Sequence, residues 1–309
     1  MKTDTEPVME STPVKDTKGT EKHKHRFLKV CVRIAVILLL LALICGAVMA
    51  GYALHYRSHY KISFYQETSP KVSCSIRIAV ISDIHNREYG EHNAALLSDL
   101  RALKPDLILF PGDMVIREQE DYQAALDLIS ESAEIAPCYG VLGNHESERI
   151  YYKDDKELPK KLENAGLKLL RNASEKILIG RDTVQLFGTE GTAYGFEQYG
   201  GREFMEKTEA DPDAYGIVMA HIPVLFDALS DYDFDLGIAG HVHGGIIKLP
   251  FIGGLYTQEE GFFPRLCVGK YTLDKGQSLI ISAGLGDSAF FPPRINNPPE
   301  LVIIDVDRY

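Results

Sequence analysis

The sequence lacks the cysteine pattern of a disulfide-stabilised or cysteine-based zinc protein. It has five cysteines, at positions 31, 45, 74, 138 and 267, and no CxxC pair. The first two lie in or beside an apolar segment. The other three are widely spaced and odd in number, so they do not form a disulfide framework. A zinc site built from cysteine thiolates is not expected for the same reason.

Basic charge is also scarce outside the N-terminal region. Residues 1–57 contain nine Lys/Arg and five Asp/Glu, so the remaining residues hold 24 of the 33 basic and 39 of the 44 acidic residues, a net charge of −15. Such an acidic body has no general electrostatic reason to bind nucleic acid, and no such partner is expected. The negative charge does not exclude phosphorylated substrates, because bound metal ions reverse the local sign of the charge.

The N-terminal region predicts a tail followed by a membrane anchor. Residues 1–26 are polar with few large apolar side chains, which predicts disorder within a cytoplasmic tail of residues 1–33. Residues 34–54, "IAVILLLLALICGAVMAGYAL", contain no charge. At about 1.5 Å per residue, this segment is long enough to span a bilayer core of about 30 Å.

The flanking charges predict the orientation of this anchor. Cations crowd the N-terminal flank, so the positive-inside rule places the N-terminus in the cytoplasm and the rest of the chain outside it. A cleaved signal peptide, with "VMA" at residues 48–50 as its cleavage site, is the alternative, although its n-region would be unusually long. A lipoprotein attached at Cys45 is weaker, since the bulky Ile44 precedes the cysteine. We therefore expect a single-pass membrane protein with an extracytoplasmic body.

Beyond a polar linker of residues 55–74, the pattern of residues 75–309 predicts one α/β domain. Apolar runs such as "SIRIAVISDIH" (75–85), "DLILFPGD" (106–113) and "CYGVLGNH" (138–145) alternate with stretches of helical spacing, residues 92–104 and 120–135. Strand–helix–strand alternation indicates a layered α/β body, in the simplest form a doubly wound sheet. Further strands are expected at "KILIG", "TVQLFG", "YGIVMAH", "FDLGIAGH", "SLIISAGLG" and "LVIIDV".

Polar residues gather where these strands end. Six histidines follow residue 60, and five of them directly follow apolar strands. Ligands in open α/β sheets bind beyond the carboxyl ends of the strands, so these side chains are expected to converge on one crevice. The set comprises Asp83, His85, Asp113, Asn144, His145, His221, His241 and His243.

The donor types in this set point to divalent metal ions. Carboxylate, amide and imidazole ligands together suit Mn, Fe, Zn, Co or Ni, without selecting one of them. Seven candidate ligands are more than a single four-coordinate ion needs. Because a carboxylate such as Asp113 can bridge two cations, two ions about 3.5–4 Å apart are a natural arrangement. Each residue alone has a plainer interpretation as a turn, a cap or a buried histidine.

Five motifs in this order resemble the calcineurin-like metallophosphoesterases. They are "DIH" (83–85), "GDM" (112–114), "GNHE" (143–146), "AH" (220–221) and "GHVHGG" (240–245). The segment "GLGDSAFFPPRINNPPELVII" (284–304) is similar to the end of the membrane-anchored bacterial branch. The resemblance implies a four-layer α/β/β/α sandwich instead of one doubly wound sheet.

The resemblance also implies roles for the individual residues. Asp83, His85, Asp113 and His243 would hold the first metal, and Asp113, Asn144, His221 and His241 the second. His145 would face the substrate and steady the transition state or protonate the leaving oxygen.

A hydroxide bridging two divalent metals would then hydrolyse a phosphoester, with phosphodiester, phospho-sugar or lipid-type envelope substrates suggested by the location. A protein or small-molecule phosphomonoesterase and a non-catalytic scaffold are the alternatives. The oligomeric state stays open.

The sequence leaves the roles of four features open. Glu146 would orient His145 or a metal ligand, or is a polar loop residue. Arg294 would pair a substrate phosphate or anchor the C-terminal turn. Residues 189–201 do not match the Asp-containing segment expected of close relatives. Residues 249–267 combine aromatics and glycines, so they would form a lip over the site, a membrane-facing loop or ordinary packing.

Overall fold

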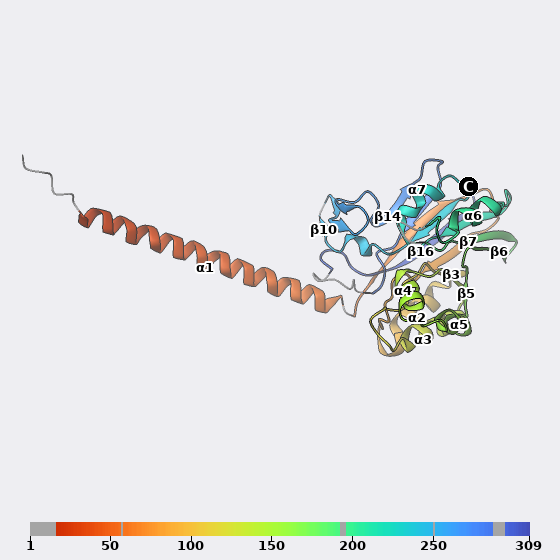
Figure 1. Cartoon of the computed structure of the whole chain (residues 1–309), viewed down its shortest axis with the longest axis horizontal. Helices are drawn as coiled ribbons and strands as arrows, with labels where there is room; N and C mark the ends of the chain where they lie inside the picture. Colours follow the sequence, from red (N-terminus) through yellow and green to blue (C-terminus); the bar gives the residue numbers. More distant parts are fainter. Residues whose placement is uncertain (1–16, 57, 192–195, 250, 287–293) are drawn as a thin grey trace, which may run out of the picture. The chain divides into compact units, whose positions relative to one another are not determined.

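The computed structural model describes residues 17–56, 58–191, 196–249, 251–286 and 294–309. The chain divides into two compact units, residues 1–51 and 52–309. Helix α1 (Thr17–His55) contains a stretch, His25–Tyr52, that is long and apolar enough to cross a membrane (Figure 1). The predicted anchor of residues 34–54 lies within α1.

The helix begins earlier than expected. Residues 17–33, predicted as part of a disordered tail, are helical, while residues 1–16 of that tail lie outside the described residues. Once a helix is nucleated, each further residue adds one hydrogen bond at little entropic cost. Residues 17–33, which contain Lys and Glu, have no proline to stop this propagation.

The predicted linker of residues 55–74 also differs, because it contains a strand of the folded domain. Strand β1 (Lys61–Thr68) pairs in parallel with β16 (Glu300–Asp307), from Lys61 opposite Glu300 to Thr68 opposite Asp307. Its partner lies more than 200 residues away, so no local pattern announces the pairing. The folded α/β domain therefore starts before residue 75.

Two mixed six-stranded sheets form the body. The first has the order β1–β16–β2–β3–β4–β5, and the second β14–β15–β9–β8–β7–β6. Strands β2, β3, β4 and β5 are mutually parallel, whereas β16 is antiparallel to β2. The strands of the first sheet are β2 (Ile76–Val80), β3 (Leu107–Phe110), β4 (Cys138–Gly140) and β5 (Leu167–Leu169), with β1 and β16. Those of the second are β6 (Ala173–Ile179), β7 (Asp182–Gly188), β8 (Tyr215–Met219), β9 (Leu236–Ala239), β14 (Gly269–Thr272) and β15 (Ser278–Ile281).

Three buried clusters show that the two sheets and their helices form four layers. One cluster lies between the sheets and includes Ile78 and Leu109 from the first and Ile217 and Ile238 from the second. Another joins the opposite face of the first sheet to α2 (Ala94–Leu103), α3 (Gln123–Ala133) and α5 (Leu158–Asn164), which lie together in Figure 1. The third covers the second sheet with α6 (Gly201–Lys207) and α7 (Phe226–Leu229). The implied α/β/β/α sandwich is confirmed, and the single doubly wound sheet is wrong.

The sequence patterns explain why these elements form. Strands β3 and β9 are apolar at every position because both faces are covered, one by the other sheet and one by helices. Helix α2 buries Leu96, Leu97 and Leu100 on one stripe and ends at Lys104 in a left-handed conformation. Helix α4 (Asn144–Tyr152) directly follows the β4 loop.

After β9, two short hairpins leave the sandwich. They are β10 (Lys248–Leu249) with β11 (Gly253–Gly254), and β12 (Tyr256–Thr257) with β13 (Gly261–Phe262). They occupy most of the segment 249–267 for which the sequence left three interpretations open.

Candidate metal centre

All eight predicted site residues lie at the carboxyl ends of parallel strands and form one connected cluster. Each follows a strand from one of the two sheets: Asp83 and His85 follow β2, Asp113 follows β3, Asn144 and His145 begin α4 after β4, His221 follows β8, and His241 and His243 follow β9. Both sheets therefore contribute to the same site, which is why residues 160 positions apart in the sequence meet.

The backbone at this cluster adopts an uncommon conformation. Five of the eight residues have a positive φ: Asp83 (50°), His85 (50°), Asp113 (53°), His241 (72°) and His243 (47°). Non-glycine residues rarely adopt this left-handed region, and such strain concentrates at functional sites. Because β2 ends at Val80, Asp83 and His85 lie in the loop that follows it, and strand alternation does not set the directions of their side chains. Their ligand atoms lie within 4.8 Å of one another because the loop after β2 turns through the left-handed conformations of both residues.

The first half of the cluster joins Asp83, His85 and His243. The Nε2 atoms of His85 and His243 are 3.2 Å apart, and Oδ1 of Asp83 lies 3.8 Å from Nε2 of His243. One ligand atom of each of the three lies within 4.8 Å of the others. Oδ2 of Asp113 is 3.9 Å from Nε2 of His85, so Asp113 borders this group too.

The second half joins Asp113, Asn144, His221 and His241. Nε2 of His221 lies 3.1 Å from Oδ2 of Asp113 and 3.2 Å from Oδ1 of Asn144. Nδ1 of His241 lies 2.8 Å from the same Asn144 oxygen and 3.3 Å from Nε2 of His221. The same oxygen of Asp113 thus faces both halves, while its Oδ1 accepts the backbone N–H of His145 at 2.9 Å.

The hydrogen bonds of the two histidines show that this second half suits a cation. Nδ1 of His221 donates to the carbonyl of Pro111 at 2.8 Å, and Nε2 of His241 faces the Glu259 carboxylate at 2.5 Å. In their neutral forms both rings would therefore turn a lone pair toward the oxygens of Asp113 and Asn144. Four acceptor atoms lie within 2.8–3.3 Å of a neighbour. Ligand atoms about 2.1 Å from a tetrahedral ion are about 3.4 Å apart, close to this spacing.

The pKa shifts of the clustered side chains show that Asp113 carries a negative charge in this site. Although burial opposes ionisation, the imidazole of His221, followed by His145 and His85, holds the pKa of Asp113 well below its usual range. Burial would lower the pKa of His221, but the Asp113 carboxylate raises it to about 10. A proton thus occupies His221 when no other cation neutralises the carboxylate. Burial lowers the pKa of His85 to about 3 and that of His243 well below its usual value, so both rings are neutral.

Gly112 allows the loop after β3 to reach this cluster. Its φ is +104°, and a Cβ atom placed there would lie 2.6 Å from Nδ1 of His221 and 2.8 Å from the backbone of Gly143. Only glycine combines this conformation with so close an approach. The "GD" pair is therefore a packing requirement of the site.

His145 is placed differently from the other histidines. Its Nδ1 accepts the backbone N–H of Arg117 at 3.0 Å, so the neutral ring carries its proton on Nε2. The ring packs edge-on against His85 with centroids 4.6 Å apart. One of its nitrogens also lies within 4.8 Å of ligand atoms of His85 and Asp113. Geometry alone thus permits either a metal contact or a contact with a bound substrate.

The buried carboxylate of Glu146 connects the loop after β3 to the loop after β4 through hydrogen bonds. Its Oε2 accepts the N–H groups of Asp113 (2.9 Å) and Gly143 (2.8 Å), and its Oε1 accepts that of Val115 (2.8 Å). It is fully buried, and burial, followed by the charge of Asp113, raises its pKa to about 7. Of the two interpretations left open, the structure supports a role in positioning, directed at the Asp113 backbone.

Two residues at the cluster come from later parts of the chain. Glu259, between β12 and β13, contacts His241, and no motif marked it in advance. Its only signal was a pair of adjacent acidic residues, Glu259 and Glu260, in a segment rich in aromatics and glycines. Nη2 of Arg294 lies 3.0 Å from Nδ1 of His243 and donates to the carbonyl of Gly286 at 2.7 Å. Residues 192–195 and 287–293, parts of two segments singled out in the sequence, lie outside the described residues.

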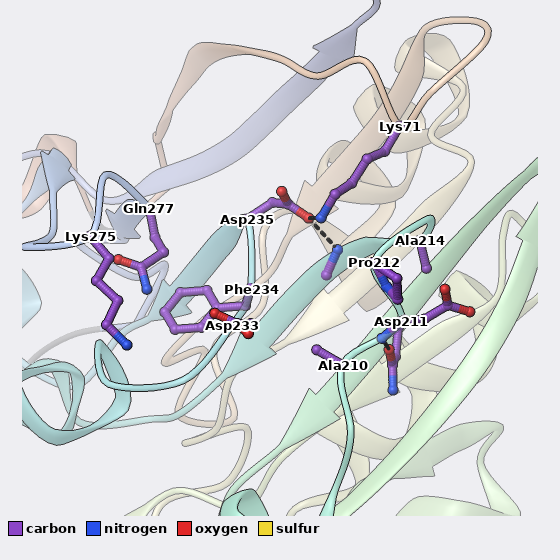
Figure 2. Close-up of a pocket in the computed structure, with 12 residues that line it drawn as sticks. Lys71, Ala210, Asp211, Pro212, Ala214, Asp233, Phe234, Asp235, Lys275 and Gln277 are labelled. Carbon is purple, nitrogen blue, oxygen red and sulfur yellow. Dashed lines mark hydrogen bonds and ion pairs between the residues drawn. The ribbon is translucent and has the colours of Figure 1, made fainter.

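A separate pocket lies at the opposite ends of the second sheet's strands. Its volume is about 320 Å³, and it is lined by residues that include Lys71, Asp211, Asp235 and Gln277 (Figure 2). Lys71 pairs with Asp235 at 2.8 Å, and Asp235 also accepts the N–H of Gly216. None of the predicted site residues lines this pocket. The chemistry therefore gathers at the other end of the strands.

Comparison with known proteins agrees with this location. Residues 76–245, just over half of the chain, match the family described as Calcineurin-like phosphoesterase. The chain is 24% identical to "Phosphodiesterase YaeI" of Escherichia coli strain K12, over 80% of this chain and 86% of that protein. It is 25% identical to "UDP-2,3-diacylglucosamine pyrophosphatase LpxG" of Chlamydia trachomatis, over 74% and 83% of the two chains.

The matched region begins with the first residue of β2 and ends with the glycine pair after His243. It therefore contains every one of the eight clustered residues and both halves of the acceptor-rich site. This fold, with histidines and aspartates able to hold metal at the strand ends, belongs to a family of hydrolases that depend on two metal ions. The chain is a member of the calcineurin-like phosphoesterases and hydrolyses phosphoester bonds.

Proposed function

We propose that the chain is a membrane-anchored dinuclear phosphodiesterase in which each half of the cluster holds one divalent ion. Asp83, His85 and His243 would hold the first ion, and Asn144, His221 and His241 the second. Oδ2 of Asp113 would contact both, since it faces His85 at 3.9 Å and His221 at 3.1 Å. When bound, the two ions would supply Lewis acidity that activates a water and neutralises phosphoryl oxygens.

One observation carries this proposal. In the second half, four acceptor atoms face one another, and the remaining nitrogens of both histidines are already engaged by Pro111 and Glu259. Facing acceptors repel unless a proton or a metal ion lies among them, and a buried carboxylate of this kind is costly when unpaired. A divalent ion satisfies all four atoms at once. The mixture of nitrogen and oxygen ligands fits Mn, Fe, Zn, Co or Ni.

His145 is proposed to act on the substrate. With Nδ1 held by the N–H of Arg117, its Nε2–H is the group available to donate a hydrogen bond to a phosphoryl or leaving oxygen. Such a donor stabilises the charge that develops on oxygen in the transition state. The fixed ring needs no reorientation when the substrate binds.

The substrate is proposed to be a phosphodiester or a lipid-type phosphoester of the cell envelope. The relatives are named as a phosphodiesterase and as a pyrophosphatase of a diacylated sugar nucleotide. An N-terminal apolar helix fits a single-pass anchor, and the basic flank before residue 34 favours a cytoplasmic N-terminus and an extracytoplasmic catalytic domain. Envelope phosphoesters are the substrates that such a location makes available.

The test uses the full chain in detergent after removal of metal. Hydrolysis of bis-p-nitrophenyl phosphate and p-nitrophenyl phosphate is measured with Mn, Fe, Zn, Co or Ni added singly, and bound metal is counted by mass spectrometry. We expect about two ions per chain in the active form and faster turnover of the diester. One ion per chain at full activity would overturn the dinuclear assignment. A reporter fused after residue 309 that is active in the cytoplasm would overturn the orientation.

A further inference from the structure

Five large apolar side chains crowd the two hairpins that follow the metal centre, where solvent would contact them. Phe251 is fully exposed, and Phe262, Ile252 and Phe263 are 70%, 64% and 62% exposed. Tyr256, 39% exposed, packs against Phe262 with ring centroids 5.3 Å apart. We call these five residues the apolar tip. An exposed apolar group of this kind marks an interaction surface.

The folding of the domain does not account for the apolar tip. Phe251 and Phe263 have φ values of 66° and 58°, in the left-handed region that aromatic residues rarely adopt. Each is exposed, so it gains little from burial that would offset this backbone strain. Glycine or asparagine would serve these two turns at lower cost. The aromatic side chains therefore have a use outside the domain.

The apolar tip belongs to the segment that reaches the metal centre. Glu259 lies in the turn between β12 and β13, and its carboxylate contacts Nε2 of His241. Tyr256 and Phe262 pair directly across the same hairpin. The tip consequently lies on the face of the domain to which the strand ends and their loops belong, and not at the pocket of Figure 2.

The part of the chain that leaves the apolar helix reaches the same face. Tyr56, two residues beyond the predicted anchor, accepts a hydrogen bond at 2.6 Å through its carbonyl from Arg87, and Arg87 follows His85 by two residues. The ring of Tyr60 packs edge-on against Tyr89 at 4.7 Å. Five residues separate the end of α1 at His55 from the start of β1 at Lys61. So short a connection spans at most about 20 Å.

We propose that the apolar tip inserts into the surface of the membrane that holds the anchor, so that the metal centre works at the bilayer interface. This inference rests on the proposed function for its anchor and substrate class. Aromatic residues favour the interfacial zone, where their rings contact both lipid and water. Because the body is strongly acidic, insertion depends on apolar contact instead of attraction to anionic lipid. Docking is therefore expected in zwitterionic bilayers and is insensitive to salt.

The absence of tryptophan from the chain gives a direct test. Phe262→Trp and, separately, Phe251→Trp place a single tryptophan in the apolar tip of the full-length protein. The variants are reconstituted in phosphatidylcholine vesicles with brominated acyl chains. We expect emission shifted to shorter wavelength and quenched by the bromolipid, at low and high salt alike. Leu178→Trp on β6, where the leucine is 75% exposed, is the matched control and should show neither effect.

Equal emission from the tip and control variants would overturn the proposal, and would be the result if the tip bound a protein partner instead of lipid. A second readout uses Phe251→Ser combined with Phe263→Ser. This variant should hydrolyse soluble bis-p-nitrophenyl phosphate like the wild type but show a raised KM for a phosphodiester embedded in vesicles. An unchanged KM would count against docking. Quenching without hydrolysis of any lipid phosphoester by the wild type would instead overturn the proposed substrate class and leave docking supported.

Discussion

Oε1 of Glu259 lies 2.5 Å from Nε2 of His241, on the side of the ring that faces away from Asn144. The contact fixes the tautomer of His241, because a carboxylate accepts and the ring nitrogen must then donate. Although burial would raise the pKa of Glu259, the interaction with His241 lowers it. A carboxylate behind a ligating histidine orients the ring and increases its basicity.

Glu259→Ala is expected to weaken binding of the second metal by about 10- to 100-fold, because His241 loses its fixed tautomer. Competition with a metal chelator measures the affinity. Glu260→Ala is the control, since Glu260 accepts the Leu266 N–H in the same segment without contacting His241. Equal affinities of the two variants would contradict the role of Glu259.

His145→Ala is expected to reduce turnover by about 10²- to 10³-fold, the typical cost of losing one donor to a developing oxyanion. The bound metal should stay near the wild-type amount, because Nδ1 of His145 is engaged by Arg117. Steady-state kinetics and metal analysis on the same preparation provide the check. A substantial loss of metal would make His145 a ligand, which its nearness to His85 and Asp113 also permits.

Gly112→Ala and Gly253→Ala separate backbone strain from crowding. Both glycines have a φ of +104°, but a Cβ at Gly112 meets His221 and Gly143, whereas a Cβ at Gly253 meets nothing within 4 Å. Left-handed strain alone costs on the order of 1–3 kcal/mol. Thermal unfolding should show this cost in both variants, a larger one in Gly112→Ala, and metal loss in Gly112→Ala only. Retention of metal by Gly112→Ala would show that His221 yields to the added methyl group.

Asp182 gives a prediction on pH. Its Oδ2 accepts the N–H groups of Ser73 (2.7 Å) and Cys74 (3.3 Å). Burial opposes ionisation, but these hydrogen bonds lower the pKa of Asp182 below its usual value. A lowered pKa stabilises the fold above the unfolded value of about 3.9, and this contribution disappears as the pH falls through the folded pKa. The stability gap between wild type and Asp182→Asn should therefore be present at pH 7 and shrink below about pH 4. A gap that stays constant over this range would contradict the assignment.

Much of the site was predictable because its residues sit beside strong local patterns. The runs before Asp83, Asp113, Asn144 and His221 are apolar at nearly every position, so strands were expected there and polar residues at their ends stood out. The strands and the helices α2 and α3 appear where the patterns placed them, shifted by a few residues. The family motifs then predicted the four layers.

The remainder depended on contacts between distant parts of the chain. Strand β1 looked like a linker because its partner, β16, lies at the other end of the sequence. Glu259 and Arg294 reach the cluster from segments whose local sequence predicts only turns. The left-handed conformations of Asp83 and His243 result from packing that overrides local preference.

By itself, the sequence determined the residue types at the site, their order along the chain and the apolar helix, since these depend on composition and local periodicity. Only the tertiary structure decided which oxygen of Asp113 faces both halves, which nitrogens of His221 and His241 face Asn144, and that Glu259 lies behind His241. Those choices follow from side-chain directions at the edges of two packed sheets, and a one-dimensional pattern does not contain them.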